Sequence, residues 1–211
     1  MSRLLVATRN PGKLAEFRRL LADLEADVVS PSEMGIRMDV PEPHATYAEN
    51  AAAKAVALCQ ASGEITLADD SGIEVAALDW GPGVHSARFS APDGPSGAEL
   101  LLDRLAGVTE RTARMVCWLA LATPDPRNGG GPSVELFEGV VAGRVAEQPR
   151  GAGGFGYDPI FELADGRTTA ELPEATKDAQ SHRGRAVAAA MPRLRELLSA
   201  RARMPITAED A

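Results

Sequence analysis

Cysteine is scarce in this sequence, since Cys59 and Cys117 are the only two among 211 residues. They lie far apart, each within an apolar or alanine-rich run, so they can form neither a disulfide framework nor a Cys-x-x-Cys zinc site. We expect two buried thiols in a reducing compartment, and we take the cytoplasm as the location.

Long apolar runs and a leader pattern are missing as well. The chain enters a short apolar strand after a single basic residue, Arg3, and no apolar run approaches the roughly 20 residues of a membrane span. We therefore expect neither a signal peptide nor a membrane-spanning segment.

Positive charge and aromatic residues are also in short supply. Lys and Arg number 22 against 30 Asp and Glu, a net charge of −8, which is the wrong sign for a surface that neutralises nucleic-acid phosphates. Nucleic acid is thus not expected as a partner, although one small anion can still bind at a helix N-terminus.

With 4% aromatic residues, the core should consist mainly of Ala, Val, Leu and Ile. The length of the chain predicts a single domain over residues 1–200, followed by a frayed tail over residues 201–211.

The chain opens with a strand, a turn and a helix. Residues 4–8 form a short apolar run, and apolar residues at helical spacing predict a helix over 11–24. Asn10 stands at the N-cap position, and Pro11 stands at the first helical position, where its missing N–H costs nothing.

A capping box begins the second predicted helix. Thr46 and Glu49 form a Thr-x-x-Glu pattern ahead of an alanine-rich stretch, which predicts a helix over 50–61 that ends near Gly63. The apolar residues 65–68 then predict a strand.

The second half of the chain predicts a hairpin and a final helix. Residues 115–122 and 134–145 are rich in β-branched and apolar residues, and the glycine-rich segment 129–132 between them predicts a long, mobile connection. A last helix is expected over 184–202 with a kink near Pro192. This order of elements indicates an α/β fold with a mixed sheet.

The turn after the first strand carries the components of a phosphate cradle, namely free backbone N–H groups and a lysine at a helix N-terminus. An ordinary capped turn with a solvated lysine explains the pattern equally well, so both interpretations stay open on this segment alone. It is not a P-loop, because Ala7 and Leu14 stand where that motif needs Gly and Ser or Thr. The candidate phosphate-binding residues are Thr8, Arg9, Asn10, Pro11, Gly12 and Lys13.

Two adjacent carboxylates, Asp69 and Asp70, follow the predicted strand and precede a Ser-Gly turn. Successive side chains of a strand point to opposite faces, so only one of the two can enter a given cleft. Glu42 is a candidate partner, because magnesium takes one or two carboxylates together with waters and substrate phosphates. A turn-capping role for Asp70 and an exposed loop position for Glu42 are the alternatives, and spacing does not separate them.

The segment 151–156 matches the Gly-x-Gly-x-x-Gly pattern, but Pro159 follows closely and argues against the helix that a dinucleotide fold requires. What remains is a glycine-rich loop that presents Phe155 and Tyr157 near Asp158. Such a loop offers an aromatic face for a base and polar groups for its edge. A tight loop with two core aromatic residues is the alternative, and it is the simpler one for this segment taken alone.

A basic cluster surrounds the start of the last helix. Lys177, His182 and Arg183 could meet a base oxygen or a phosphate, and a solvated basic helix start is the alternative. Ser71 does not belong to a serine-hydrolase motif, because Gly-x-Ser-x-Gly would need glycine at the position of Asp69.

Five motifs, in matching order from about residue 3 to residue 198, together resemble the inosine/xanthosine triphosphate pyrophosphatase family. That resemblance implies an elongated mixed β-sheet flanked by helices in two lobes, with the nucleotide in the cleft between them, and a homodimer. The motifs are Thr8-x-Asn10-x-x-Lys13, Glu49-Asn50-Ala51, Ala68-Asp69-Asp70-Ser71-Gly72, Gly153-Gly154-Phe155-Gly156-Tyr157-Asp158-Pro159 and Ser181-His182-Arg183-Gly184.

The resemblance also implies roles for individual residues. It makes the turn from Thr8 to Lys13 the triphosphate-binding segment, Asp70 the catalytic base and a magnesium ligand, and Glu42 the second magnesium carboxylate. Arg9 departs from the family pattern, in which this position is often small or neutral. The further implied substrate contacts are Ser71, Phe155, Gly156, Tyr157, Asp158, Lys177, His182 and Arg183.

The implied activity is magnesium-dependent hydrolysis of ITP, dITP or XTP to the monophosphate and pyrophosphate, with Asp70 activating water for attack at the α-phosphorus. A Maf-like nucleotide pyrophosphatase with another nucleotide preference is the first alternative, and the Ser-His-Arg and Gly-Gly-Phe-Gly-Tyr-Asp motifs disfavour it. A nucleotide-binding module without catalysis is the second alternative, and in such a module the carboxylates would be dispensable.

Overall fold

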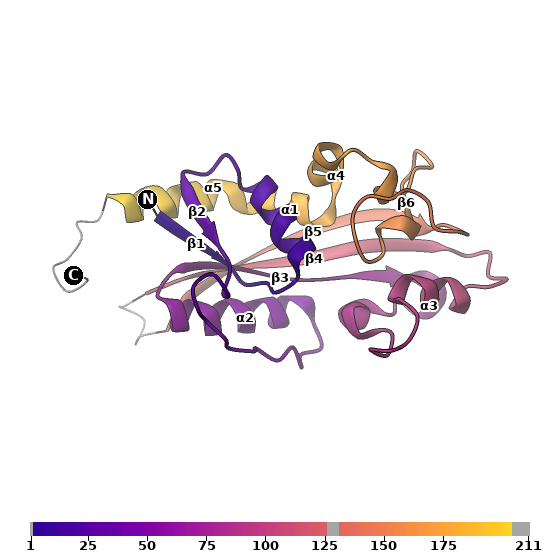
Figure 1. Cartoon of the computed structure of the whole chain (residues 1–211), viewed down its shortest axis with the longest axis horizontal. Coiled ribbons are helices and arrows are strands. Elements are labelled where there is room, and N and C mark those ends of the chain that lie inside the picture. Colours follow the sequence, from indigo (N-terminus) through magenta and orange to yellow (C-terminus); the bar gives the residue numbers. More distant parts are fainter. Residues whose placement is uncertain (1, 126–130, 204–211) are drawn as a thin grey trace.

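The computed structural model describes residues 2–125 and 131–203. Within these ranges the chain forms an elongated molecule whose three longest strands run along the long axis (Figure 1). Two sequence predictions fall partly outside the described residues: the frayed tail from residue 204 onward, and Gly129 and Gly130 of the mobile connection.

The strands form one six-stranded mixed sheet in the order β2-β1-β3-β4-β5-β6, which confirms the predicted α/β fold with a mixed sheet. β1 pairs in parallel with β2 and with β3, whereas the β3–β4, β4–β5 and β5–β6 pairs are antiparallel. The elements are β1 (Ser2–Val6), α1 (Pro11–Leu20), β2 (Ala26–Val29), α2 (Tyr47–Ser62), β3 (Ile65–Val75), η1 (Ala76–Leu78), η2 (Gly83–Arg88), α3 (Gly97–Arg104), β4 (Thr112–Thr123), β5 (Ser133–Val145), η3 (Asp158–Ile160), β6 (Phe161–Glu162), η4 (Thr169–Glu171), α4 (Glu174–Gln180) and α5 (His182–Ala202), where η marks a 3-10 helix.

The predicted start of α1 is confirmed, because Pro11 is its first residue and Asn10 Oδ1 accepts a hydrogen bond from the Lys13 N–H. The predicted end at residue 24 is wrong, since the helix ends at Leu20. Leu21 and Leu24 are nevertheless buried in the turn that follows. The apolar spacing in the sequence correctly indicated that Leu21 and Leu24 are buried. It could not distinguish a last helical turn from a buried loop.

The predicted N-cap and C-cap residues of α2 are confirmed, although the capping box is only half formed, because the Glu49 carboxylate accepts a hydrogen bond from the Thr46 hydroxyl rather than from the Thr46 main-chain N–H. Thr46 Oγ1 accepts a hydrogen bond from the Glu49 N–H, and Gly63 ends the helix in the left-handed conformation at φ 70°. α2 begins at Tyr47, slightly earlier than the alanine-rich stretch suggested.

β3 corrects the prediction of a strand that ends at residue 68. It continues without a turn through Asp69, Asp70 and Gly72 to Val75, because β4 pairs with it along this whole length. Asp70 stands opposite Trp118 in this ladder. The alternation of faces was predicted correctly, but the carboxylates lie in the middle of a strand rather than at its end.

β3 has a free edge on the side away from β4. β1 pairs only with residues 65–67 of β3 and then leads into the turn before α1. Farther along, the Ile73 N–H donates to Ser86 Oγ and the Val75 N–H donates to the Gly81 carbonyl, so η2 and the preceding loop cover the end of the edge. An opening remains between these two covers, beside Asp70 and Ser71.

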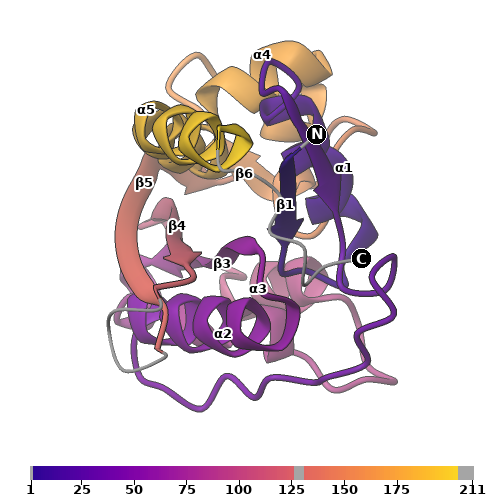
Figure 2. The ribbon, with the colours of Figure 1, turned by 90° about the vertical axis from the view of Figure 1, so that its left-hand side faces the viewer.

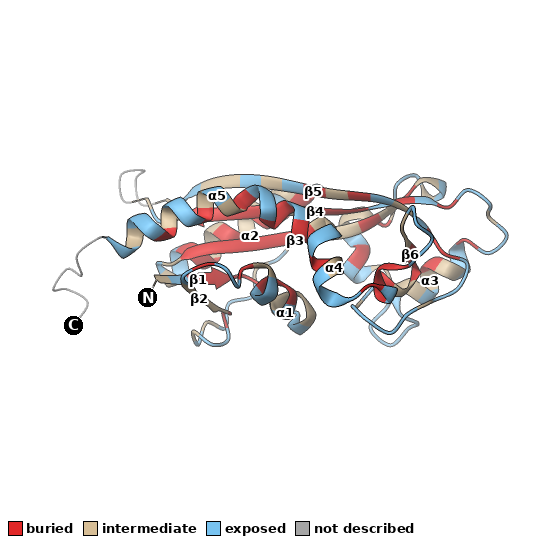
Figure 3. Cartoon of the chain, turned by 90° about the horizontal axis from the view of Figure 1, so that it is seen from above, coloured by how far each residue is buried: buried red, intermediate tan, exposed pale blue. Residues whose placement is uncertain are grey.

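Helices cover both faces of the sheet. α1 and α5 pack on one face and α2 packs on the other, as Figure 2 shows. The central strands are buried along most of their length (Figure 3). The core is largely aliphatic as predicted, and its buried aromatic side chains are Phe17, Tyr47 and Phe161.

The far end of the molecule has its own apolar cluster beneath α3, β6 and the ends of β3, β4 and β5 (Figure 1). Sequence analysis missed β2, α3, α4 and β6, which are all short. It predicted the β4–β5 hairpin and α5 correctly, although the kink at Pro192 stays a prediction. The expected absence of a long helix after residues 151–156 is confirmed, since the one-turn η3 and the short β6 follow.

Both thiols are free and buried, as expected. Burial raises the pKa of Cys117 to about 12. In the part of the chain that the structure describes, no helix combines the length and the apolar character that crossing a membrane requires.

Candidate functional site

A cavity of about 280 Å³ opens beside the free edge of β3, between the turn before α1, the loop before α2, η2, the glycine-rich loop and the start of α5. It brings together twelve predicted site residues from distant parts of the chain. They are Asn10, Lys13, Glu42, Asp70, Ser71, Phe155, Gly156, Tyr157, Asp158, Lys177, His182 and Arg183.

The four other predicted residues, Thr8, Arg9, Pro11 and Gly12, lie in the turn next to this cavity. Thr8 Oγ1 accepts a hydrogen bond from the Asn10 N–H and so shapes the turn. Arg9 is directed elsewhere, since its guanidinium pairs with Asp39 at 3.0 Å and donates to main-chain carbonyls of the same segment. Its predicted contact with the triphosphate stays a prediction.

Gly12 explains how the turn and the glycine-rich loop meet. A Cβ atom at this position would lie 2.8 Å from Cδ1 of Phe155, so only glycine lets the ring pack against the start of α1. The phosphate-binding and base-binding segments predicted from the sequence are therefore in direct contact.

Asp70 is a buried carboxylate that lines the cavity, with 6% of its surface exposed. Asn50 Nδ2 donates to its Oδ2 at 3.0 Å, and the Ser71 N–H donates to its Oδ1 at 2.9 Å. Burial raises the pKa of Asp70; the Asn50 hydrogen bond offsets part of this effect, and the negative charge of Glu42 adds to it. A carboxylate held in this way is more basic than an exposed one.

Glu42 lies in the same cavity and carries the second negative charge. It forms ion pairs with Lys54 and, at 3.6 Å, with Arg88, so two cations restrain it beside Asp70. Among the described residues, no three His, Cys, Asp or Glu side chains gather closely enough to form a metal site alone. Two carboxylates that repel each other across a polar cavity nevertheless fit magnesium, which completes its shell with waters and substrate phosphates.

Asp69 points to the opposite face of β3 and is almost fully buried. Its Oδ2 lies 2.8 Å from Lys13 Nζ and 3.1 Å from Arg183 Nη2, and it accepts a hydrogen bond from the Ser71 hydroxyl. Burial raises the pKa of Asp69, but the charges of Lys13 and Arg183 outweigh burial and hold this pKa well below its usual range. Asp69 therefore organises cations of the site rather than serving as a base.

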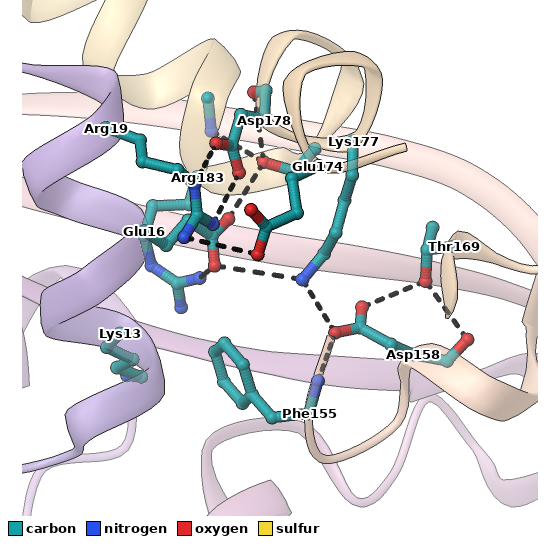
Figure 4. Close-up of polar contacts among 12 residues, drawn as sticks. Lys13, Glu16, Arg19, Phe155, Asp158, Thr169, Glu174, Lys177, Asp178 and Arg183 are labelled. Atoms are coloured by element: carbon teal, nitrogen blue, oxygen red, sulfur yellow. Dashed lines mark hydrogen bonds and ion pairs between the residues drawn. The ribbon is translucent and has the colours of Figure 1, made fainter. Parts of the chain in front are cut away.

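Arg183 is the largest fully buried side chain of the described residues, and it joins α5 to α1 and β3. Its Nη1 donates to Glu16 at 2.9 Å, its Nε and Nη2 donate to Asp69, and Nη2 also donates to Ser71 Oγ. Figure 4 shows this guanidinium between Glu16 and Phe155 of the glycine-rich loop. Four of its five N–H groups thus have protein partners.

The glycine-rich loop is held by Asp158, whose carboxylate is buried. Oδ2 accepts hydrogen bonds from the Phe155 N–H and from Lys177 Nζ, both at 2.7 Å, and Oδ1 accepts one from Thr169 Oγ1 at 2.9 Å (Figure 4). The Phe155 ring lies 5.0 Å from Lys177 Nζ. Asp158 therefore fixes the loop, and its predicted contact with a base stays a prediction.

Tyr157 and His182 complete the cavity wall. The Tyr157 hydroxyl donates to the main-chain carbonyl of Ser86 at 2.8 Å, and burial raises the pKa of Tyr157 to about 12. Burial, together with the positive charge of Arg183, holds the pKa of His182 well below its usual range, so its imidazole is neutral at pH 7.

Each cation of the cavity is matched by a carboxylate: Lys13 by Asp69, Lys177 by Asp158, and Arg183 by Asp69 and Glu16. Sequence reasoning assigned no role to four residues that hold the site together. Asn50 appears in one of the quoted motifs, so the sequence held a signal for it. Glu16 carries no such signal, because an acidic residue three positions after Lys13 on an amphipathic helix is usually expected to be exposed. The four are Glu16, Asn50, Lys54 and Arg88.

Comparison with known proteins agrees with this geometry. The model of the Ham1 family matches residues 4–193. The chain is 46% identical to the dITP/XTP pyrophosphatase of Symbiobacterium thermophilum over 201 residues, which cover 93% of this chain and 96% of that protein. It is 46% identical over 202 residues to the dITP/XTP pyrophosphatase of Ralstonia nicotianae, covering 92% and 98%. A solved structure of a HAM1 protein from Coxiella burnetii superposes with a TM-score of 0.80 at 36% identity and covers 93% of this chain and all of that one.

Proposed function

The chain belongs to the Ham1 family, and on this premise we propose that it hydrolyses dITP, ITP or XTP to the nucleoside monophosphate and pyrophosphate with the help of magnesium. The observation that carries the proposal is the single cavity in which Asp70 and Glu42 face Lys13, Lys177 and the base-binding loop. Carboxylates for a metal, cations for phosphates and an aromatic ring for a base are the groups that this substrate requires.

Asp70 has the position and the raised pKa of a general base. It would accept a proton from the water that attacks the α-phosphorus, and pyrophosphate would leave. Asn50 and the Ser71 N–H each donate one hydrogen bond to the carboxylate and so orient it, and the remaining lone pairs on the cavity side would accept the proton of the water. Lys13 and Lys177 would bind the phosphates, and the N–H groups at the start of α1 would assist them.

Magnesium is proposed from the charge of the site. Glu42 and Asp70 would hold the ion, and it would neutralise negative charge on the triphosphate. The support is that Lys13, Lys177 and Arg183 are already matched by buried carboxylates, so the protein supplies little net positive charge to a polyanion.

The purine class is proposed from hydrogen-bond complementarity. Hypoxanthine and xanthine present an oxygen at the six position, where adenine presents an amino group, so a donor in the cavity favours the deaminated base. Phe155, beside Lys177, offers the ring on which any purine can stack.

The direct test measures pyrophosphate release from ITP, dITP, XTP, GTP and ATP, with and without magnesium. We expect the three deaminated substrates to be hydrolysed far faster than ATP, and all activity to require the metal. Equal rates with ITP and ATP would contradict the substrate class, and full activity in a chelator would contradict the role of the ion.

A homodimer in the cytoplasm is also proposed. In support of the dimer, Trp80 is 47% exposed and lines a surface hollow with Trp118 of β4, and Leu136, 43% exposed, projects from the same face of the neighbouring β5. We expect sedimentation to give twice the mass of the chain, and Trp80→Glu to shift it toward the mass of one chain. A wild-type protein with the mass of one chain would contradict the dimer.

A further inference from the structure

Ser86 is a buried serine in η2 that the nucleotide chemistry above does not use, although it lines the cavity. Its Oγ accepts a hydrogen bond from the Ile73 N–H at 2.9 Å and donates to the Gly83 carbonyl at 2.6 Å. The first bond satisfies an edge N–H of β3, and the second closes the turn in which Ser86 sits. The hydroxyl therefore fastens η2 to the strand that carries Asp70.

The main chain of Ser86 makes a second connection. Its carbonyl accepts the hydrogen bond from the Tyr157 hydroxyl at 2.8 Å, across 71 positions of the sequence. Tyr157 belongs to the glycine-rich loop, in which Phe155 and Asp158 are joined by their own hydrogen bond. One residue thus links the catalytic strand on one side to the base-binding loop on the other.

η2 packs closely against β3, so the segment that carries Ser86 has little room to move. A Cβ atom on Gly72 would lie 2.5 Å from Ser86 Oγ and 2.4 Å from the Gly83 carbonyl oxygen, so η2 lies directly against the backbone of β3. Gly72 follows Asp70 by two positions and therefore lies on the same face of the strand. A shift of η2 would move the wall beside the general base and the loop together.

We propose that Ser86 is a positioning residue that holds the base-binding loop at a fixed place relative to Asp70. The inference rests on the proposed function for its kinetic consequences, but the link itself is a property of the folded chain. Loss of the hydroxyl should let η2 move, and the Tyr157 contact should weaken with it.

The kinetic test compares Ser86→Ala, Tyr157→Phe and the double variant with ITP and magnesium. We expect each single change to raise KM roughly threefold to tenfold, the size of effect that one lost hydrogen bond produces. Because both changes break the same link, the double variant should resemble Ser86→Ala alone rather than show the product of the two effects. Effects that multiply would overturn the proposal.

A second measurement needs no activity and separates this inference from the proposed function. Amide hydrogen exchange over residues 153–158 should speed up in Ser86→Ala. Ser30→Ala is the matched control, because Ser30 is equally buried and hydrogen-bonded but lies outside the cavity, so it should lower thermal stability without changing exchange in the loop or KM. Unchanged exchange over 153–158 in Ser86→Ala would overturn the proposal even if the wild-type enzyme hydrolyses ITP, and faster exchange would support it even if ITP is not a substrate.

Discussion

Asp70→Asn is expected to lower kcat with ITP by about 100-fold to 10,000-fold, the usual contribution of a general base. The amide has nearly the same shape as the carboxylate, but it cannot accept the proton of the attacking water. It also removes one of the two negative charges available to the metal, since only Glu42 would remain. Steady-state kinetics at saturating magnesium measure the effect.

Asp103→Asn is the matched control for this prediction. It makes the same chemical change at an exposed position of α3, outside the cavity, so turnover should stay at the wild-type level. If Asp70→Asn also retained turnover near the wild-type level, Asp70 would not be the base.

The raised pKa of Asp70 sets the sign of two pH effects. Activity should fall on the acid side as the carboxylate takes up a proton, at a higher pH than for an exposed aspartate. Stability should change in the opposite sense, because a carboxyl with a higher pKa in the folded state lowers the free energy of unfolding as pH rises through its unfolded and folded pKa values. In the absence of metal, the wild type should therefore lose more stability than Asp70→Asn as pH rises through this range, and an equal pH dependence in the two proteins would contradict this account.

Arg183→Ala is expected to lower the free energy of unfolding by about 3 to 5 kcal/mol, the cost of removing one partner from a buried ion pair. The guanidinium is 2% exposed and is the shared partner of Glu16 and Asp69, which are each 1% exposed. Without it, Glu16 would keep the Ser181 hydroxyl and the distant Lys177, at 3.9 Å, and Asp69 would keep Lys13 and the Ser71 hydroxyl. Urea unfolding measures the difference.

Arg185→Ala is the control, since it removes an arginine two positions later on α5 whose exposed guanidinium donates to the Val140 carbonyl. Its loss should cost little. A stability loss in Arg183→Ala no larger than in Arg185→Ala, together with a raised KM, would mean that Arg183 acts mainly on the ligand. The sequence suggested that role, and one N–H of the guanidinium remains for it.

Local signals in the sequence were sufficient wherever structure depends on neighbouring residues. Asn10 and Pro11 at the start of α1, Thr46 at the start of α2 and Gly63 at its end are where they were expected, because caps act within one helical turn. The glycine-rich loop and its aromatic residues were also recognised, and Pro159 lies in the single 3-10 turn η3 that follows the loop instead of the long helix of a dinucleotide fold.

The sequence by itself determined which groups the site contains. It contains carboxylates, lysines and an aromatic ring, because motifs record residue types at fixed spacings. It also determined that Asp69 and Asp70 face opposite sides of a strand. These conclusions need only local geometry.

Only the tertiary structure decided which partners surround each of these groups and how its pKa is shifted. Asp70 has a raised pKa and Asp69 a lowered one because Lys13 and Arg183 converge on Asp69 at one face of β3, whereas Asn50 and Glu42 lie on the other face beside Asp70. Glu16 is buried rather than exposed because α5 brings Arg183 to it from 167 positions away. The pKa of a carboxylate depends on the charges and the solvent around it in space, and no spacing along the chain specifies those.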